Sequence, residues 1–376
     1  MTAPDFEARL RAVCDAGIRL AAERHSSPLA KDVQSLSRHF GAEKGSREAG
    51  YLRRPGERRA YLGWFAPRNA ARVALLLRQL VEEGHLPPWE RPAVLDLGAG
   101  PLSGLLGAWA AFGALGEAVA VDLAAPALAD GEQLFASSGA VATRLQTRVA
   151  SLQHPADWQL RGGLDLILVA NAIGEVGDPR RAIPARAAVL SAAASHLAPG
   201  GRLLVLEPGT RIHGQALMRL RDRLVEAGQL RVLAPCTGAK TCPLLAAHGS
   251  WCHAEASWRP PPSVAALARE SGLKATPLGY SYLLLGRDGG APEGFRLVGG
   301  LMRARGTERR YVCSAAGLLE WSARGALPPQ VSGAPRGRLL ATCPPQVTTG
   351  LAQGDATSAE RPRSSRARRG REAEGS

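Results

Sequence analysis

A short apolar stretch that leads into a glycine-rich loop constrains the fold of this chain more than any other feature. Residues 93–104 read Ala-Val-Leu-Asp-Leu-Gly-Ala-Gly-Pro-Leu-Ser-Gly. The apolar half predicts a buried strand with Asp96 near its end, and Gly98 and Gly100 predict a turn into a helix. Because glycine has no side chain, the backbone there can approach a bound ligand closely. The stretch therefore predicts the first strand–turn–helix unit of a cofactor-binding domain.

The alternation of strand and helix continues along the chain. Further apolar runs at 118–121, 165–170 and 202–206 are separated by helical stretches rich in alanine, such as 186–196. Regular alternation of this kind is typical of βαβ units around a parallel sheet. Hydrophobic residues make up 45% of the chain and aromatic residues 5%, so the core must be built mainly from Leu, Val and Ala. We therefore predict an α/β fold of the Rossmann-like class.

Two polar residues after later strands indicate which cofactor the loop binds. Asp122 ends the second apolar run, where an acid can bind both ribose hydroxyl groups, and Asn171 follows the run 165–170. The dinucleotide fingerprint G-x-G-x-x-G, started at Gly98, would need a glycine where this chain has Ser103. These features favour S-adenosylmethionine over NAD and predict a class I methyltransferase fold. The predicted cofactor-binding residues are Asp96, Gly98, Gly100, Asp122 and Asn171.

Two departures from active methyltransferases bear on catalysis. Leu102 stands where methyltransferases usually have a third glycine, in a loop that should contact the cofactor. The place where base-methylating enzymes carry Asn/Asp-Pro-Pro-aromatic reads Asn171-Ala-Ile-Gly, so no catalytic residue is assigned. An inactive pocket on a Rossmann-like fold is therefore an alternative, because a fold does not fix a function.

Composition divides the chain into four predicted regions. Residues 1–90 form an N-terminal helical region, and residues 91–290 form the Rossmann-like domain with a Cys-rich metal-binding insertion at 230–262. Residues 291–343 form a small β-rich C-terminal region. Residues 344–376 are rich in Pro, Ser, Thr, Gly and Arg, which predicts a disordered basic tail.

Arginine and aromatic residues are interleaved between residues 51 and 72. Basic residues beside aromatic rings can clamp RNA, and the formal net charge of +14 favours polyanionic partners. The same pattern also fits a solvated helix face whose rings are buried, so both interpretations stay open. The arginines are Arg53, Arg54, Arg58, Arg59, Arg68 and Arg72, and the rings are those of Tyr51, Tyr61, Trp64 and Phe65.

Three cysteines gather in a loop-rich segment, and a fourth follows in a later apolar run. They are Cys236, Cys242, Cys252 and Cys313. Four thiolates can close a zinc site or hold an iron–sulfur cluster, and the wide spacing differs from the paired C-x₂-C of a zinc ribbon. His248 and His253 are alternative ligands for zinc. Cys14 and Cys343 are expected to be ordinary cysteines.

Several short motifs together resemble one known family. Val-Leu-Asp-Leu-Gly-Ala-Gly-Pro is followed by Leu-Glu-Pro-Gly, Ala-Pro-Cys, Cys-Pro-Leu, Trp-Cys-His and Tyr-Ser-Tyr-Leu. From about Tyr51 to Leu319 the chain resembles the methyltransferase-like family that assists assembly of the small ribosomal subunit in mitochondria and bacteria. The resemblance implies binding to small-subunit rRNA and a 4Fe–4S cluster, whose ligands by position would be Cys236, Cys242, Cys252 and Cys313. Four nearby arginines would then face RNA, namely Arg303, Arg305, Arg309 and Arg310.

The combined prediction is an S-adenosylmethionine-dependent, methyltransferase-like iron–sulfur protein that acts on small-subunit rRNA. The alternatives are a non-enzymatic assembly factor with a vestigial pocket and a small-molecule methyltransferase with a structural zinc. No stretch approaches the roughly 20 apolar residues of a membrane span, and the N-terminus lacks the features of a signal or transit peptide. A monomeric cytoplasmic protein without membrane contact is therefore expected.

Overall fold

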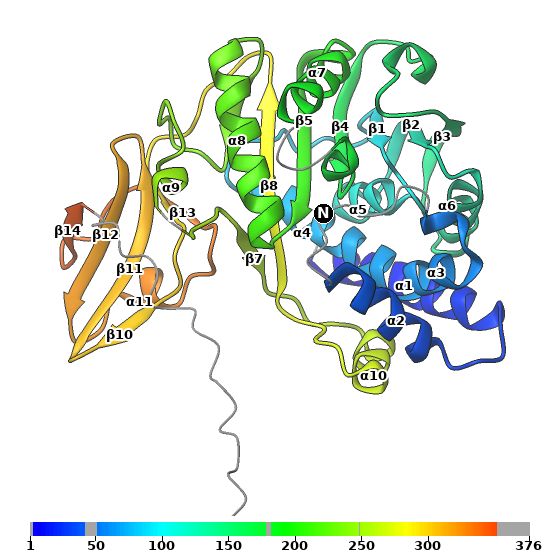
Figure 1. Cartoon of the computed structure of the whole chain (residues 1–376), viewed down its shortest axis with the longest axis horizontal. Helices are drawn as coiled ribbons and strands as arrows, with labels where there is room; N and C mark the ends of the chain where they lie inside the picture. Colours follow the sequence, from blue (N-terminus) through cyan, green and yellow to red (C-terminus); the bar gives the residue numbers. More distant parts are fainter. Residues whose placement is uncertain (1–2, 42–50, 178–181, 248, 352–376) are drawn as a thin grey trace, which may run out of the picture.

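The computed structural model describes residues 3–41, 51–177, 182–247 and 249–351. A large sheet with helices on both faces holds most of these residues, and a smaller sheet lies to one side of it (Figure 1). Most of the predicted disordered tail, residues 352–376, lies outside the described residues. Within the described part of the chain, no helix is both long and apolar enough to cross a membrane.

Helices fill the N-terminal region because apolar side chains recur at helical spacing. In the first helix Leu10, Val13 and Leu20 lie on one buried face, while Arg11 and Arg19 between them are exposed. Proline at the first helical turns of α3 and α4 suits positions where no backbone donor is needed. The elements are α1 (Ala3–Glu23), α2 (Leu29–Gly41), η1 (Tyr51–Arg53), α3 (Pro55–Ala60), the π-helical turn η2 (Tyr61–Phe65) and α4 (Ala66–Glu82).

The large sheet has eight strands in the order β3-β2-β1-β4-β5-β8-β6, with β7 paired to β8. β1 to β5 are parallel, whereas β8 runs antiparallel to β5, β6 and β7. This topology confirms the predicted Rossmann-like α/β sheet. The strands are β1 (Val94–Leu97), β2 (Leu115–Asp122), β3 (Ala142–Val149), β4 (Leu164–Ala170), β5 (Leu197–Pro208), β6 (Arg231–Ala234), β7 (Ala254–Ala256) and β8 (Leu278–Gly286).

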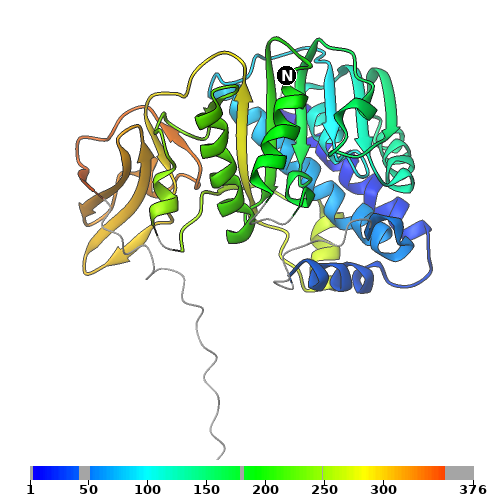
Figure 2. The same ribbon diagram turned by 45° about the horizontal axis from the view of Figure 1, so that its top comes forward.

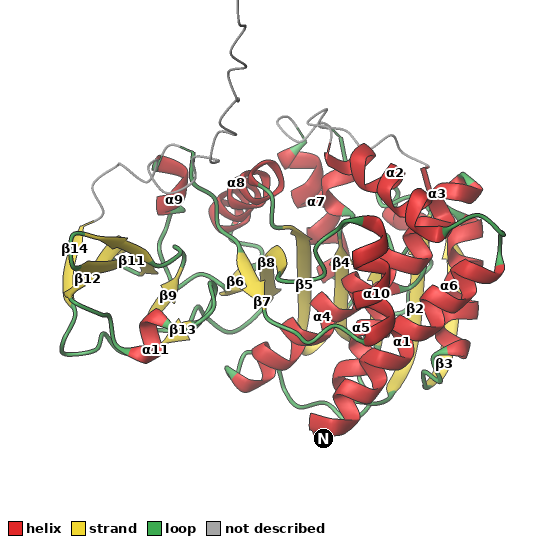
Figure 3. Cartoon of the chain, turned by 90° about the horizontal axis from the view of Figure 1, so that it is seen from below, coloured by secondary structure: helices red, strands yellow, loops and turns green. Residues whose placement is uncertain are grey.

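Two hydrophobic cores form because helices cover both faces of the sheet. One core holds residues of α1, α4, α5 and α6, and the other holds residues of α7 and α8 (Figures 2 and 3). All four residues of β1 are buried between them. The remaining helices and turns are α5 (Ser103–Phe112), α6 (Ala125–Ser137), η3 (Pro155–Trp158), η4 (Ile173–Glu175), α7 (Ile183–Ala194), α8 (Arg211–Ala227), α9 (Pro243–Ala246) and α10 (Pro262–Ser271).

The smaller sheet has six strands and its own core of Leu297, Val312 and Trp321. Its central strand β11 alternates between partly exposed and buried residues, as expected for a sheet with one covered face. The strand β14 lies in the segment from residue 344 for which the sequence predicts a disordered tail. The elements are β9 (Phe295–Leu297), β10 (Met302–Ala304), β11 (Thr307–Ser314), β12 (Gly317–Arg324), α11 (Pro329–Ser332), β13 (Leu339–Leu340) and β14 (Thr348–Leu351).

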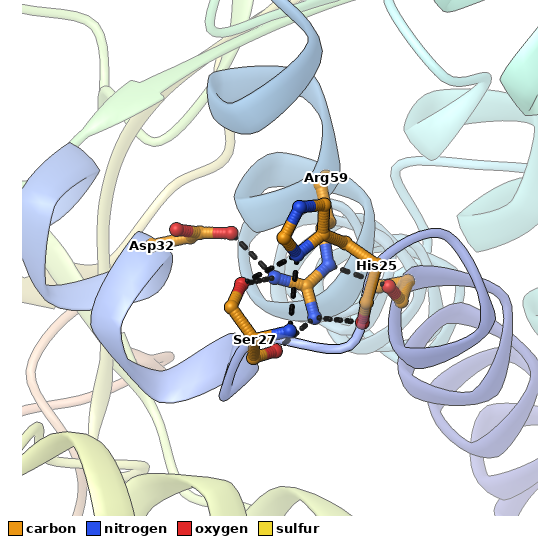
Figure 4. Close-up of polar contacts among 5 residues, drawn as sticks. His25, Ser27, Asp32 and Arg59 are labelled. Atoms are coloured by element: carbon orange, nitrogen blue, oxygen red, sulfur yellow. Dashed lines mark hydrogen bonds and ion pairs between the residues drawn. The ribbon is translucent and has the colours of Figure 1, made fainter.

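The arginine-rich and aromatic-rich segment from residue 51 is mainly structural. Tyr61 and Trp64 are buried, and the Arg68 guanidinium lies over the Trp64 ring and donates to the Ala275 carbonyl. Arg59 is 4% exposed, and its guanidinium points into the turn between α1 and α2 (Figure 4). The segment therefore fits the interpretation of buried rings better than an RNA clamp.

One arginine of the small sheet also differs from the expected RNA-facing role. Arg310 is 3% exposed and donates to the backbone carbonyls of Gly299, Val331 and Ala334. The expectation that it faces RNA is therefore wrong, because alternation along β11 turns its side chain inward.

Candidate cofactor pocket and four-cysteine pocket

The glycine-rich loop after β1 adopts a backbone that only small residues tolerate well. Gly98 and Gly100 have φ angles of +73° and +49°. A Cβ atom on Gly98 would lie 2.3 Å from the Cβ atom of Ala172 in the neighbouring loop after β4. The two loops therefore approach each other closely at the point where β1 and β4 end.

Asp122 ties the end of β2 to the glycine loop. Its Oδ2 atom accepts a hydrogen bond from the Gly100 N–H at 2.8 Å, and its Oδ1 atom accepts one from the Ala124 N–H at 2.8 Å. Burial raises the pKa of Asp122, and these backbone donors oppose the rise. Asp122 also lines the adjacent cavity, and its carboxylate has lone pairs beyond the two that accept these hydrogen bonds.

A cavity of about 240 Å³ lies at the carboxyl ends of the first four strands. Four of the five predicted cofactor residues line it, namely Gly98, Gly100, Asp122 and Asn171. Ligands of open parallel sheets bind in this place, where the strand order changes direction between β1 and β4. The fifth residue, Asp96, is 1% exposed and lies under the loop, where its Oδ2 atom accepts from the Leu105 N–H at 3.2 Å. Asp96 thus supports the start of α5.

Leu102 does not crowd this cavity. It has a φ angle of +58° and is fully buried, and a Cβ atom on Gly131 of α6 would lie 2.4 Å from its Cδ1 atom. The side chain therefore packs against α6, where a glycine makes room for it. Leu102 therefore does not line the cavity at the ends of the strands.

The four cysteines singled out in the sequence line a second cavity, of about 40 Å³. Cys236, Cys242 and Cys252 come from the loops after β6, whereas Cys313 comes from β11 of the small sheet. Burial raises the pKa of all four thiols, and the other three thiols raise that of Cys252 further. The fold thus gathers the four thiols at the junction of the two sheets.

A sequence profile identifies the family of the chain. The profile of the family described as mitochondrial small ribosomal subunit Rsm22 matches residues 58–321, which is more than half of the sequence. The chain belongs to the Rsm22 family. No functionally curated protein matches the sequence.

Several solved methyltransferases share part of the fold with this Rsm22-family chain. An S-adenosylmethionine-dependent methyltransferase from Clostridium acetobutylicum is 11% identical, with a TM-score of 0.37 over 58% of this chain and 91% of that one. Magnesium protoporphyrin IX methyltransferase from Synechocystis with bound S-adenosylmethionine is 13% identical, with a TM-score of 0.35 over 68% and 97%. Ribosomal protein L11 methylase from Lactobacillus delbrueckii is 12% identical, with a TM-score of 0.33 over 58% and 79%.

The metal predicted for this Rsm22-family chain stays a prediction. The described residues contain no group of three or more His, Cys, Asp or Glu side chains that could hold a metal ion. His253 stacks on Trp251 with ring centroids 4.8 Å apart and contacts Arg336, so it lies outside the lining of the cysteine pocket. His248 lies outside the described residues.

The N-terminal helices contribute residues to the cofactor cavity that sequence reasoning missed. Leu52, Arg53 and Tyr61 line the cavity, and a Cβ atom on Gly100 would lie 3.3 Å from the Leu52 Cδ1 atom. These residues reach the cavity only in the folded chain, because η1 and η2 fold back over the ends of the strands.

The Glu-Pro-Gly motif at the end of β5 has a local structural role. The buried Glu207 carboxylate accepts a hydrogen bond from the Gly174 N–H at 3.2 Å and so holds the loop after β4.

We expect the stability of the domain to depend on the ionisation of Asp96. Burial raises the pKa of Asp96 from 3.8 to about 7. Between these two pH values the folded protein keeps a proton on Asp96 that the unfolded chain has lost. The contribution of this proton to the free energy of unfolding is fully present below the unfolded pKa of 3.8 and is lost as the pH rises through the folded pKa of about 7. Between pH 6 and 8 the free energy of unfolding should fall by about 1.4 kcal/mol from this group. Urea unfolding of wild type and Asp96→Asn checks this, because the amide variant should lack that fall.

Proposed function

We propose that this chain binds S-adenosylmethionine, carries an iron–sulfur cluster and acts on small-subunit rRNA in ribosome assembly. The observation that carries the proposal is the convergence of Gly98, Gly100, Asp122 and Asn171 on one cavity at the ends of the parallel strands. Membership of the Rsm22 family, whose name refers to the small ribosomal subunit, supports the ribosomal role. The position of Leu102 outside the cavity supports a working pocket over a vestigial one.

Each lining residue has a role that follows from its chemistry. The backbone at Gly98 and Gly100 allows close approach, and the Asp122 carboxylate can accept both ribose hydroxyl groups while it holds the loop amides. Leu52 and Tyr61 would close the cavity from the N-terminal side and exclude water. The cofactor, when bound, supplies an electrophilic methyl group. The residues present fit this cofactor, although no side chain is assigned as a catalytic acid or base.

Calorimetry with S-adenosylmethionine tests the pocket. Loss of the Asp122 carboxylate should weaken binding by about 100-fold, or about 2.7 kcal/mol, because both ribose hydroxyl groups lose a charged acceptor. Asp157→Ala is the matched control, since its carboxylate is 66% exposed in η3 and lies outside the cavity. Wild-type protein that binds no cofactor would leave the non-enzymatic assembly factor as the better reading.

The residues that line the cysteine pocket provide the ligands that an iron–sulfur cluster needs. Four cysteines and no Asp, Glu, His or Lys line the pocket among the described residues, and four cysteines are the ligand set of 4Fe–4S clusters as well as of all-cysteine zinc sites. A cluster takes one thiolate per iron and so accepts ligands spread around a larger cavity. The cluster supplies an anionic, electron-accepting centre when bound. Bound to all four cysteines, the cluster would link the loops after β6 to β11, which carries Cys313.

The iron content of anaerobically purified protein tests the cluster. Wild type should hold about four irons and four sulfides per chain. Cys313→Ser should lose most of this iron, because one of the four ligands is gone and the small sheet no longer contributes a thiolate to the pocket. Cys343→Ser should keep it, since Cys343 lies outside the pocket beside Thr349. Equal iron in the two variants would contradict the assignment of ligands.

Exposed arginines on the small sheet support an RNA partner. Arg303 is 72% exposed and Arg309 is 42% exposed on the hairpin of β10 and β11, and each also contacts a carboxylate. The net charge of +14 agrees with a polyanionic partner. Binding to small-subunit rRNA that weakens steeply with salt would support this part of the proposal. No salt-dependent RNA binding would favour the small-molecule methyltransferase with structural zinc.

A further inference from the structure

We propose that a ring of buried hydrogen-bond donors, formed by Arg221, Thr237, Tyr282 and Arg296, holds the anionic sulfur centre of the four-cysteine pocket and sets its reduction potential. This inference rests on the cluster of the proposed function. In this inference the four donor residues, and not the cysteines, compensate the negative charge of the centre.

The four side chains share one unusual property. Each lines the cysteine pocket, and each has a buried polar atom with no hydrogen-bond partner among the described residues. Buried polar atoms without partners each cost about 1–3 kcal/mol, so four around one cavity point to a group that accepts from them. The atoms are Arg221 Nε, Thr237 Oγ1, Tyr282 Oη and Arg296 Nη2.

All four atoms can donate a hydrogen bond, and this determines the kind of group they would meet. Nε and Nη2 of arginine are donors only, and the hydroxyl groups of Thr237 and Tyr282 can donate as well as accept. Of the described residues that line the pocket, none is Asp, Glu, His or Lys. The lining therefore offers thiols, two guanidinium groups and three hydroxyl groups, one of which, that of Ser281, already donates to the Cys252 carbonyl. This set suits a centre with excess negative charge. Four thiolates around iron and sulfide, or around zinc, form such a centre.

Arg296 lines the pocket, and one of its nitrogens is buried without a hydrogen-bond partner among the described residues. It is 1% exposed, and its Nη1 atom pairs with Glu83 Oε2 at 2.9 Å and with the Gly337 carbonyl at 2.9 Å. Its Nε atom donates to the Pro235 carbonyl at 2.9 Å, next to Cys236. These three bonds fix the guanidinium, so Nη2 remains as the donor for the cavity. Glu83 caps the C-terminus of α4, so its bond to Arg296 connects the pocket to the helical layer of the large sheet.

Arg221 is arranged in a similar way on α8. Its side chain is 4% exposed, and Nη1 pairs with Asp222 at 2.7 Å and with the Lys240 carbonyl at 2.8 Å. Its charge opposes the rise in the pKa of the neighbouring Cys236 thiol. Two fixed cations therefore lie against one set of thiols, from α8 and from β9.

The two hydroxyl groups allow a test with little risk of misfolding. Tyr282→Phe and Thr237→Val remove a single polar atom or replace it with a methyl group. In metal-free protein these variants should be at least as stable as wild type, because an unpaired buried atom is gone. In loaded protein they should lose the centre faster, because a hydrogen bond to sulfur is gone. A variant that is stabilised without metal but loses the centre faster when loaded has removed a hydrogen bond to the centre. A residue with a purely structural role would not change the two states in opposite directions.

The experiment uses full-length protein reconstituted without oxygen with iron and sulfide. Midpoint potential, metal content and the rate of bleaching in air are measured for wild type, Tyr282→Phe, Thr237→Val and Arg296→Met. Loss of a buried cation should make reduction harder, because reduction adds negative charge. We expect Arg296→Met to lower the reduction equilibrium constant by at least about tenfold, which is about 59 mV for one electron. Tyr280→Phe is the control, since Tyr280 lies on the same strand β8 but outside the pocket lining.

The outcomes separate this inference from the proposed cluster. Wild type that holds iron, with all three variants within twofold of the control in bleaching rate and unchanged in potential, overturns the donor ring and leaves the cluster intact. Wild type that takes up neither iron nor zinc overturns both. If wild type holds zinc, the part of the inference that concerns the reduction potential is overturned, because zinc has no redox chemistry. Faster release of zinc to a chelator from the three variants would then support only the hydrogen bonds to the thiolates, and equal release rates would overturn these as well.

Discussion

Replacing Gly98 with alanine should abolish cofactor binding and destabilise the domain by about 2–4 kcal/mol. The new Cβ atom would lie 2.3 Å from the Cβ atom of Ala172, far inside contact distance, and the φ angle of +73° is itself unfavourable for alanine. Because the loops after β1 and β4 both line the cavity, they can separate only by distorting it. We expect the affinity for S-adenosylmethionine to fall by more than about 100-fold in calorimetry.

Two further variants isolate the cause. Gly56→Ala, in α3, has no atom within 4 Å of its new Cβ, so its free energy of unfolding should change by less than about 1 kcal/mol. The double variant Gly98→Ala with Ala172→Gly removes the clash but keeps the backbone strain. It should regain part of the stability and affinity. Wild-type affinity in the single Gly98 variant would show that the ligand does not use this loop.

Local sequence signals predicted the loop, the parallel strands and the four thiols because each is encoded over a short distance. Gly98 and Gly100 need no tertiary information to predict a turn, and the apolar run 165–170 became β4. Strand β3 was missed because it is an edge strand with exposed residues such as Val149 and so lacks a continuous apolar run.

Residues whose roles depend on distant partners could not be predicted. From the sequence alone, Leu102 is a departure from the usual glycine of the loop, and its contact with Gly131 of α6 can be seen only in the fold. Tyr61 and Leu52 belong to the cofactor cavity only because helical segments fold back over the sheet. The direction of the Arg59 and Arg310 side chains likewise depends on packing. The sequence therefore predicted an exposed, RNA-facing Arg310, whereas this side chain is buried.

Removal of the Arg59 side chain should destabilise the N-terminal helices more than loss of any exposed arginine. Its five N–H groups make five hydrogen bonds to the end of α1, to the turn that follows and to the first turn of α2 (Figure 4). These bonds use its whole capacity to donate. The acceptors are the carbonyls of Ala21, His25 and Ser27, the Ser27 hydroxyl group and the Asp32 carboxylate, whose Oδ2 atom lies 2.5 Å away. Arg59→Ala should cost about 3–5 kcal/mol in free energy of unfolding, because buried acceptors lose their donor.

Chemical denaturation of matched variants tests this, and cofactor binding gives a second measurement. Arg54→Ala removes an exposed guanidinium in an ion pair with Glu57, so it should change stability by no more than about 0.5 kcal/mol. Arg59→Lys should fail to rescue, because an ammonium group cannot reproduce the planar fork of donors. Since α3 leads directly into Tyr61 over the cavity, Arg59→Ala should also weaken S-adenosylmethionine binding while Arg54→Ala does not. Unchanged stability in Arg59→Ala would mean that burial of apolar residues such as Val13 and Leu62 alone holds these helices in place.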